Sequence, residues 1–199
     1  MNPDTVYETL RELASPVVAV TSRSGDRCNG MIANSAVRAS LVPECPRLTF
    51  YCFKFHFSHE LIESSGRFCL HLLHREQMSV VDRLGFESGR EREKLSKLEH
   101  STTESGLPRI EGAAAVFDCR VINAMDAGPS TIFLGEAEHV ERHPDFEDLE
   151  LMHGEDLREG LPEERRKDYR ENKRRVQQQA ADNLEVDPTY SWTPSGTDD

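Results

Sequence analysis

A short run of polar and cationic residues, KFHFSH, offers groups that can hold a phosphate. It extends from Lys54 to His59 and follows an apolar segment that is typical of a β-strand. Ser58 is an expected N-cap for a helix in HELIESS that stops at Gly66. A helix start supplies free backbone N–H groups and a favourable dipole, and Lys54 supplies positive charge. The run predicts a site for a phosphate dianion, although a solvated helix cap has the same residue types.

A second run, GMIANSA, contains groups that suit a flat heteroaromatic ring. Gly30 permits close approach of the backbone, Asn34 carries a side-chain amide and Ser35 carries a hydroxyl. A flavin ring needs amide-type donors along its polar edge and apolar contact on its faces. Because an Asn-Ser pair is also common in turns, neither run identifies a site by itself.

The elements that would carry these runs are mostly strands. A helix is expected over residues 3–14, followed by a buried strand in PVVAVTS and a hairpin turn at Gly25-Asp26. The segment from Leu48 to Phe55 is the most β-like, and FCLHLL predicts another strand. EQMSVVDRLG predicts a helix ending at Gly85, and SGREREKLSKL predicts a short exposed helix.

Two long strands are expected around a turn at Asp126–Pro129. Alternation along the first strand predicts one wet face and one core face, with Val116, Asp118 and Arg120 set against Phe117, Cys119 and Val121. Several short strands, many turn signals and few helices together predict a mainly β fold, a β-barrel with added helices.

The chain is expected to divide near residue 143. Residues 1–143 carry the strands, whereas residues 144–199 are rich in Glu, Arg, Asp and Gln. EERRKDYRENKRRVQQQAADN has high helix propensity and sparse apolar residues, so it predicts a helical arm rather than a second core. Tyr190 and Trp192 either anchor this extension on a partner subunit or belong to a frayed tail.

Composition narrows the class of protein. The chain has 199 residues and a formal net charge of -12, which disfavours non-specific binding to nucleic acid or anionic membranes. No apolar run approaches the length of a membrane span, and the polar N-terminus is unlike a signal peptide. The five cysteines form no C-x-x-C pair and several lie in apolar runs, so buried reduced thiols and a cytoplasmic location are expected.

The sequence lacks the motifs that are typical of metal sites, serine hydrolases, nucleotide-binding loops and nucleic-acid sites. The eight histidines have no cysteine or carboxylate beside them in a tight ligand arrangement, so no metal site is predicted. The G-x-S-x-G, P-loop and G-x-G-x-x-G patterns are absent. The basic cluster RENKR sits in a mixed-charge helix, which favours a salt-bridged face over a nucleic-acid site.

The order of these segments is more specific than any one of them. PVVAVTS is followed by G-M-x-x-N-S and S-L-x-P, and an apolar strand then ends in K-x-x-x-S-H-E-L-I. S-G-R-F-x-L-x-L-L, SGRER-EKL, GLPRIEGAAAVFDCRV and DAGPSTIFLGEAEHVE complete the series. From about Leu13 to Glu141 the chain resembles the flavin reductase-like family of FMN-binding split barrels. The resemblance implies a Greek-key-like split barrel that binds FMN as a homodimer.

The resemblance also implies which residues contact FMN. One set would lie along the ring and ribityl chain or in the loop that follows: Met31, Ile32, Ala33, Asn34, Ser35 and Ser40. A second set would lie at the phosphate: Phe53, Lys54, Ser58 and His59. Lys94, in REREKL, is similar to a lysine that approaches the cofactor from a later loop. Hydride transfer from NADH or NADPH to flavin N5 requires no side-chain acid or base, so no catalytic residue is assigned.

One departure from the family pattern divides the functional hypotheses. Many members carry a Gly-Asp-His turn that helps to receive the nicotinamide, and the matching stretch here is Gly128-Pro129-Ser130. The first hypothesis is an NAD(P)H-dependent flavin reductase that supplies electrons to a monooxygenase or another acceptor. The second is a non-enzymatic FMN-binding electron carrier or flavin store. A split barrel that handles haem, or one that has lost its cofactor, is a further alternative.

Overall fold

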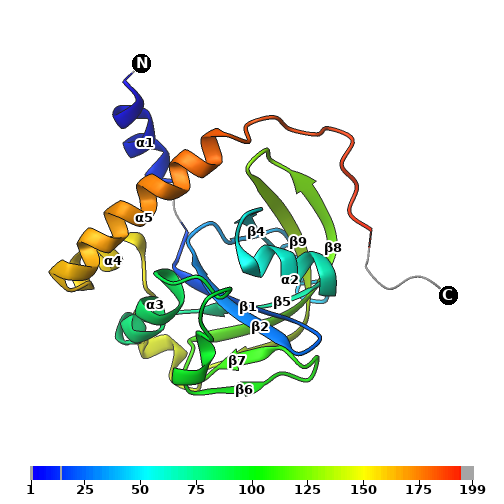
Figure 1. The fold of residues 1–199 in the computed structure, drawn as a ribbon. Coiled ribbons are helices and arrows are strands. Elements are labelled where there is room, and N and C mark those ends of the chain that lie inside the picture. The colour runs from blue at the N-terminus through cyan, green and yellow to red at the C-terminus, as the bar shows by residue number, and fades with distance from the viewer. Residues whose placement is uncertain (1, 14, 194–199) are drawn as a thin grey trace.

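The computed structural model describes residues 2–13 and 15–193. Its main body is a seven-stranded antiparallel sheet that curls into a half-open barrel, with strand order β2-β1-β5-β8-β9-β4-β3 (Figure 1). The strands of this sheet are β1 (Val18–Ser24), β2 (Arg27–Ala33), β3 (Val37–Arg38), β4 (Arg47–Phe53), β5 (Arg67–Leu72), β8 (Ala115–Asp126) and β9 (Ser130–Arg142). A separate hairpin pairs β6 (His100–Thr102) with β7 (Pro108–Ile110). The mainly β class predicted from the sequence is confirmed.

Helices cover the outside of the barrel. They are α1 (Pro3–Arg11), α2 (Phe57–Ser65), α3 (Met78–Gly85), α4 (Gly154–Gly160) and α5 (Glu163–Ala181), with short 3-10 turns at Arg75–Gln77, Leu95–Lys97 and Phe146–Asp148. The prediction of Ser58 as N-cap is wrong, because His56 holds that position and the Ser58 hydroxyl instead accepts a hydrogen bond from Asn29. Helix α2 ends as predicted at Gly66, whose φ of 65° is left-handed.

Strand β1 is buried on both faces. Val18 and Val20 pack in a first core cluster inside the barrel. Ala19, and Val17 just before the strand, pack in a second cluster on the outer side, which joins β1 to α3 and α4. The alternation follows from the two-residue period of a strand.

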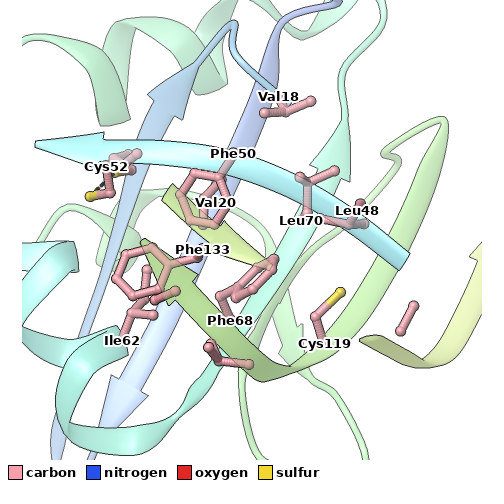
Figure 2. Packing of buried hydrophobic residues seen from close by; sticks show 14 residues of the cluster. Val18, Val20, Leu48, Phe50, Cys52, Ile62, Phe68, Leu70, Cys119 and Phe133 are labelled. Atoms are coloured by element: carbon pink, nitrogen blue, oxygen red, sulfur yellow. Dashed lines mark hydrogen bonds between the residues drawn. The ribbon is translucent and has the colours of Figure 1, made fainter. Parts of the chain in front are cut away.

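Three phenylalanines fill the first core cluster (Figure 2). Phe50 of β4 packs against Phe68 of β5 and Phe133 of β9, with ring centroids 4.9 Å and 5.8 Å apart. The Phe50–Phe68 pair is edge-to-face, which suits the charge distribution of aromatic rings. These rings join β5 across the barrel interior to the neighbouring strands β4 and β9.

The long β8–β9 hairpin forms as predicted, but its expected wet face is wrong. Val116 and Asp118 are buried, and only Arg120 of the three residues assigned to that face is exposed. The segment around the β6–β7 hairpin covers this side, and the Ser105 hydroxyl donates to the Asp118 carboxylate at 2.7 Å. A buried carboxylate with such a donor needs no contact with water.

The segment SGREREKLSKL is not the exposed helix that its composition predicts. Only Leu95–Lys97 forms a 3-10 turn, and both Lys94 and Leu95 are buried. Leu95 joins the second core cluster, which draws the loop inward. Lys94 and Leu95 therefore attach the loop to the barrel, whereas residues 90–93 stay exposed.

The chain beyond residue 143 packs against the barrel. Met152 and Leu157 belong to the second core cluster, and α5 forms within the charged stretch predicted to be helical. The division of the chain at residue 143 stays a prediction, and residues 194–199 of the extension lie outside the described residues. No helix in the described ranges has both the length and the apolar character needed to cross a membrane.

The two aromatic residues near the end of the chain anchor it on its own barrel. Tyr190 and Trp192 pack against the first core cluster, and the Tyr190 hydroxyl donates to Glu63 at 2.8 Å. After α5 the chain passes the tip of the β8–β9 hairpin (Figure 1), where the Asp187 N–H donates to Asp126 at 2.8 Å. The structure thus gives both aromatics intrachain contacts, rather than a frayed tail.

The approach of Gly135 to Phe68 generates a test of core packing. A Cβ at Gly135 would lie 2.5 Å from the Phe68 ring, so Gly135→Ala should destabilise the fold by about 1–3 kcal/mol. Phe68→Leu removes the clashing ring atoms, so the double variant should lose less stability than the sum of the two single changes. Urea unfolding of the four proteins measures this coupling, and strict additivity would contradict the packing described.

Candidate functional site

A cavity of about 420 Å³ lies beside β2 and opens to solvent. This first cavity is bounded by the end of β2, the start of α2, the loop of residues 86–94, and residues of α3, α4 and α5. Its volume falls in the range of small-molecule sites. The two sequence runs that suggested chemistry, GMIANSA and KFHFSH, both contribute to its wall.

Part of the predicted site lines this cavity. The residues in its wall are Met31, Ile32, Ala33, Asn34, Ser58 and Lys94. They come from three segments far apart in the sequence, and the hairpin pairing of β1 with β2 sets the register of Met31, Ile32 and Ala33. The structure therefore places the expected ring-binding segment, one hydroxyl and the loop lysine around one space.

The other predicted residues lie outside the described wall of the first cavity. The Ser35 hydroxyl accepts from the Tyr51 N–H at 3.3 Å, and the Ser40 hydroxyl accepts from the Val42 N–H at 3.1 Å. Lys54 donates to Asp126 at 2.7 Å, His59 hydrogen bonds to Thr131 at 2.8 Å, and Phe53 stacks on Phe55. The predicted eleven-residue site as a whole stays a prediction.

Two polar residues that the prediction omitted, the buried Asn29 and the half-buried His56, form part of the cavity wall. Asn29 donates from Nδ2 to the Ser58 hydroxyl at 2.9 Å, which ties β2 to α2. The Oδ1 atom of Asn29 and the Nδ1 atom of His56 are buried without a hydrogen-bond partner among the described residues. Buried polar atoms of this kind require a ligand or a water. Both residues sit within or next to the two runs, which is the signal that could have found them.

The electrostatics of this end of the cavity favour an anion. Lys94 is buried, its ammonium donates to the Leu84 carbonyl at 2.8 Å, and burial lowers its pKa to about 8. Burial also lowers the pKa of His56 to about 4, with Lys94 and Arg175 among the charges that add to the shift. His56 is therefore neutral at pH 7, and it faces cationic side chains beside the first turn of α2.

Carboxylates also reach the cavity, so its charge is mixed. Glu87 and Glu91 line it together with Arg90, whose guanidinium donates to Glu60 at 2.7 Å. Arg90, Lys94 and Arg175 exceed Glu87 and Glu91 by one positive charge in the described wall. A phosphate fits this end, because the positive side chains, the Ser58 hydroxyl and the helix start lie together. Met31, Ala33 and Asn34 supply apolar contact and an amide farther along.

Helix α5 completes the wall of the cavity. The residues that it contributes recur at helical spacing and are Tyr169, Asn172, Arg175, Val176 and Gln179. Tyr169 contacts Phe86 edge-on, and Arg165 pairs with Asp82 at 2.7 Å, which holds α5 against α3 and the following loop. The C-terminal extension is thus part of the site.

Comparisons with known proteins agree with the fold. The family model for a flavin reductase like domain matches residues 10–160. The chain belongs to this family, and the split-barrel fold predicted from the resemblance is confirmed. The match ends before α5, so that helix lies outside the part shared with the family.

Individual relatives support the same assignment. A high molecular weight rubredoxin from Moorella thermoacetica is 30% identical over 130 residues, which cover 64% of this chain and 56% of that protein. The chain thus spans little more than half the length of that relative. The reductase subunit of a flavin-dependent monooxygenase from Mycobacterium tuberculosis is 30% identical over 144 residues, 72% of this chain and 74% of that protein.

A solved structure is similar over most of its length. The NADH:FAD oxidoreductase of Streptomyces globisporus, in complex with NAD and FAD fragments, is 25% identical with a TM-score of 0.65. The similarity covers 76% of this chain and 88% of that chain. The architecture of the barrel is therefore shared.

The loop of residues 86–94 depends on a glycine that touches the buried amide. A Cβ at Gly89 would lie 2.0 Å from Asn29 Oδ1, and Asn29 cannot move without losing its bond to Ser58. Gly89→Ala should therefore cost about 1–3 kcal/mol of stability. Gly154→Ala is the matched control, because its Cβ would meet only Asn34 at 4.0 Å. Thermal unfolding compares the two, and equal effects would show that Gly89 is not constrained.

Proposed function

We propose that this chain is an NAD(P)H-dependent flavin reductase that binds FMN in the first cavity. One observation carries the proposal: the cavity joins the β2 segment from Met31 to Asn34 with the start of α2 and the buried Lys94. The expected ring-binding segment, one of the residues expected at the phosphate (Ser58) and the loop lysine Lys94 therefore line one space of suitable size.

The residues of the cavity fit FMN by their chemistry. Ser58, Lys94 and the first turn of α2 would hold the phosphate, and the buried Nδ1 of His56 offers a further polar contact. Met31 and Ala33 offer apolar surface to the ring, and the Asn34 amide offers a hydrogen bond to its polar edge. The protein contributes binding, orientation and electrostatics, with no side-chain acid or base in the proposal.

A bound flavin would supply the redox chemistry, as the acceptor of a hydride from NADH or NADPH and of one proton from water, with NAD(P)⁺ and reduced flavin as the products. Leu84 and Leu157 line the cavity and limit the access of water to the bound ring. Because a relative is a reductase subunit of a monooxygenase, we propose that reduced flavin passes to a monooxygenase partner.

One observation favours the alternative of a non-enzymatic flavin carrier. The turn at Gly128–Ser130 lacks the family's Asp and His, and it is covered by this chain's own C-terminal segment. The Gly128 N–H donates to Asp126 at 2.9 Å, and a Cβ at Gly128 would lie 2.9 Å from the Leu184 carbonyl. If relatives bind the nicotinamide at this turn, this chain either binds the nicotinamide at another place or does not bind it.

We also propose a cytoplasmic homodimer. All five cysteines are free thiols, which supports a reducing compartment. Large apolar side chains are exposed along the β3–β4 edge and the loop between these strands, including Val37, Leu41 and Val42. An exposed apolar patch of this kind supports pairing with a second copy. Light scattering on the purified protein tests this, and a monomeric mass would contradict it.

A visible spectrum of the purified protein followed by FMN titration tests the central proposal. Flavin bands or saturable FMN binding, together with oxidation of NADH or NADPH in excess flavin, are expected. Binding of FMN without oxidation of either nucleotide would support the carrier instead. A chain that neither carries nor binds FMN would overturn both assignments.

The buried lysine generates a pH-dependent prediction. Lys94 has a pKa of about 8, and an adjacent phosphate dianion should raise it, so binding FMN keeps the lysine charged. FMN affinity should therefore be highest below pH 8 and fall as the pH rises toward 9.5. The pKa of His56, about 4, keeps that residue neutral across this range.

Lys94→Met should weaken FMN binding at pH 7 on the order of 10- to 100-fold and remove the decline above pH 8. Lys97→Met is the control, because Lys97 is exposed and lies away from the described wall of the first cavity. Fluorescence titration from pH 7 to 9.5 measures both effects. An unchanged pH profile in Lys94→Met would show that another group binds the phosphate.

A further inference from the structure

A second cavity, of about 500 Å³, adjoins the first on the side away from α2. It lies between α1, α4 and α5, which are close together in Figure 1. Asn34, Leu157, Leu161 and Tyr169 line both cavities. The two spaces therefore adjoin along these four residues, among which Asn34 belongs to the segment proposed to contact the flavin ring.

Helix α5 faces both cavities with different sides. Arg166, Arg170 and Lys173 line the second cavity, whereas Asn172 and Arg175 line the first. None of the side chains of α5, which is described in full, is buried, so the helix contributes no apolar stripe to the core. A helix that is polar all round does not lie against the protein in order to bury apolar surface. The lining of two cavities by two of its polar sides explains why α5 has this composition.

The second cavity combines cationic and aromatic groups. Arg170 and Lys173 lie one turn apart on α5, and the Lys173 ammonium is 3.5 Å from the centre of the Tyr7 ring of α1. Arg166 has a structural role, because it donates to the carbonyls of Leu161 and Glu159 at the end of α4. The carboxylates that reach the cavity are Glu12 and Glu155.

We propose that the second cavity binds the adenosine diphosphate half of NADH or NADPH, with Arg170 and Lys173 on the diphosphate. The inference rests on the proposed flavin reductase function. Arginine and lysine are the usual partners of phosphate groups, and the Tyr169 ring in the cavity wall offers a surface on which a base can stack, while Tyr7 holds the Lys173 ammonium in place. The nicotinamide end would enter the first cavity at Asn34, where the two spaces meet.

This placement makes α5 part of the binding site for the electron donor. Because the family match ends at residue 160, the proposed contacts belong to a segment that the shared domain does not supply. The affinity for FMN should then depend on Lys94, and the affinity for the donor nucleotide should depend on Arg170 and Lys173. Variants of the two sets can therefore change one affinity without the other.

Equilibrium binding of NAD⁺ and NADP⁺, which cannot reduce flavin, tests the site without relying on activity. Isothermal titration compares the full-length wild type with Arg170→Ala/Lys173→Ala and with Arg174→Ala/Lys167→Ala. The second pair removes the same charge from exposed positions of α5 away from the described walls of the two cavities. The first pair should weaken nucleotide binding at least tenfold and change FMN binding less than twofold. The control pair should change both less than twofold.

Steady-state kinetics and one further variant give independent readouts. Arg170→Ala/Lys173→Ala should raise the KM for NADH or NADPH at least tenfold with little change in kcat. Tyr7→Ala, which alters the same cavity from α1, should also weaken NAD⁺ and NADP⁺ binding. Far-ultraviolet circular dichroism establishes that each variant keeps its fold.

The outcomes separate this inference from the proposed function. If the wild type binds FMN and oxidises NAD(P)H while Arg170→Ala/Lys173→Ala binds the nucleotides normally, the second cavity is not the site and the reductase function stands. Equal weakening by the control pair would indicate general charge attraction and overturn the site as well. If the wild type binds neither FMN nor either nucleotide, both the proposed function and the inference about the second cavity are wrong.

Discussion

Strand β1 carries the constraint on which the rest of the structure depends, because both of its faces are buried. Val18 and Val20 fill the barrel, so Ala19 and the residues beside it need a second apolar layer on the outside. Helices α3 and α4 supply that layer. The first cavity is bounded by residues of these same helices and by β2, so the site follows from the need to cover the outer face of the sheet.

Hydrogen bonds rather than apolar contacts hold the polar end of that cavity. The Asn29–Ser58 bond ties β2 to α2, and the bond from Lys94 to the Leu84 carbonyl ties the following loop to α3. Burying such groups costs free energy that partial pairing does not fully restore. The unpaired Nδ1 of His56 shows that a polar contact remains to be made, which suits a site prepared for a ligand.

Particular residues show how far the sequence could predict the site. Met31 and Asn34 were found because a strand followed by a polar turn is a local pattern that the family resemblance makes specific. Lys94 was assigned to the cofactor from its motif, yet its segment was predicted to be an exposed helix, since charge dominates its composition. Asn29 directly precedes one run and His56 lies inside the other, but the local sequence does not show which polar atoms become buried, so both were omitted. The polar sides of α5 looked like solvated surface for the same reason.

The sequence by itself determined where the long strands lie along the chain, the turn at Asp126–Pro129 and the helix end at Gly66, because hydrophobic period and glycine act within a few residues. Only the tertiary structure decided that Lys94 is buried, that Lys54 pairs with Asp126 and that α5 lies against two cavities. These features depend on which distant segments cover the same face of the sheet. Burial and pairing across such distances follow from packing, which no local pattern specifies.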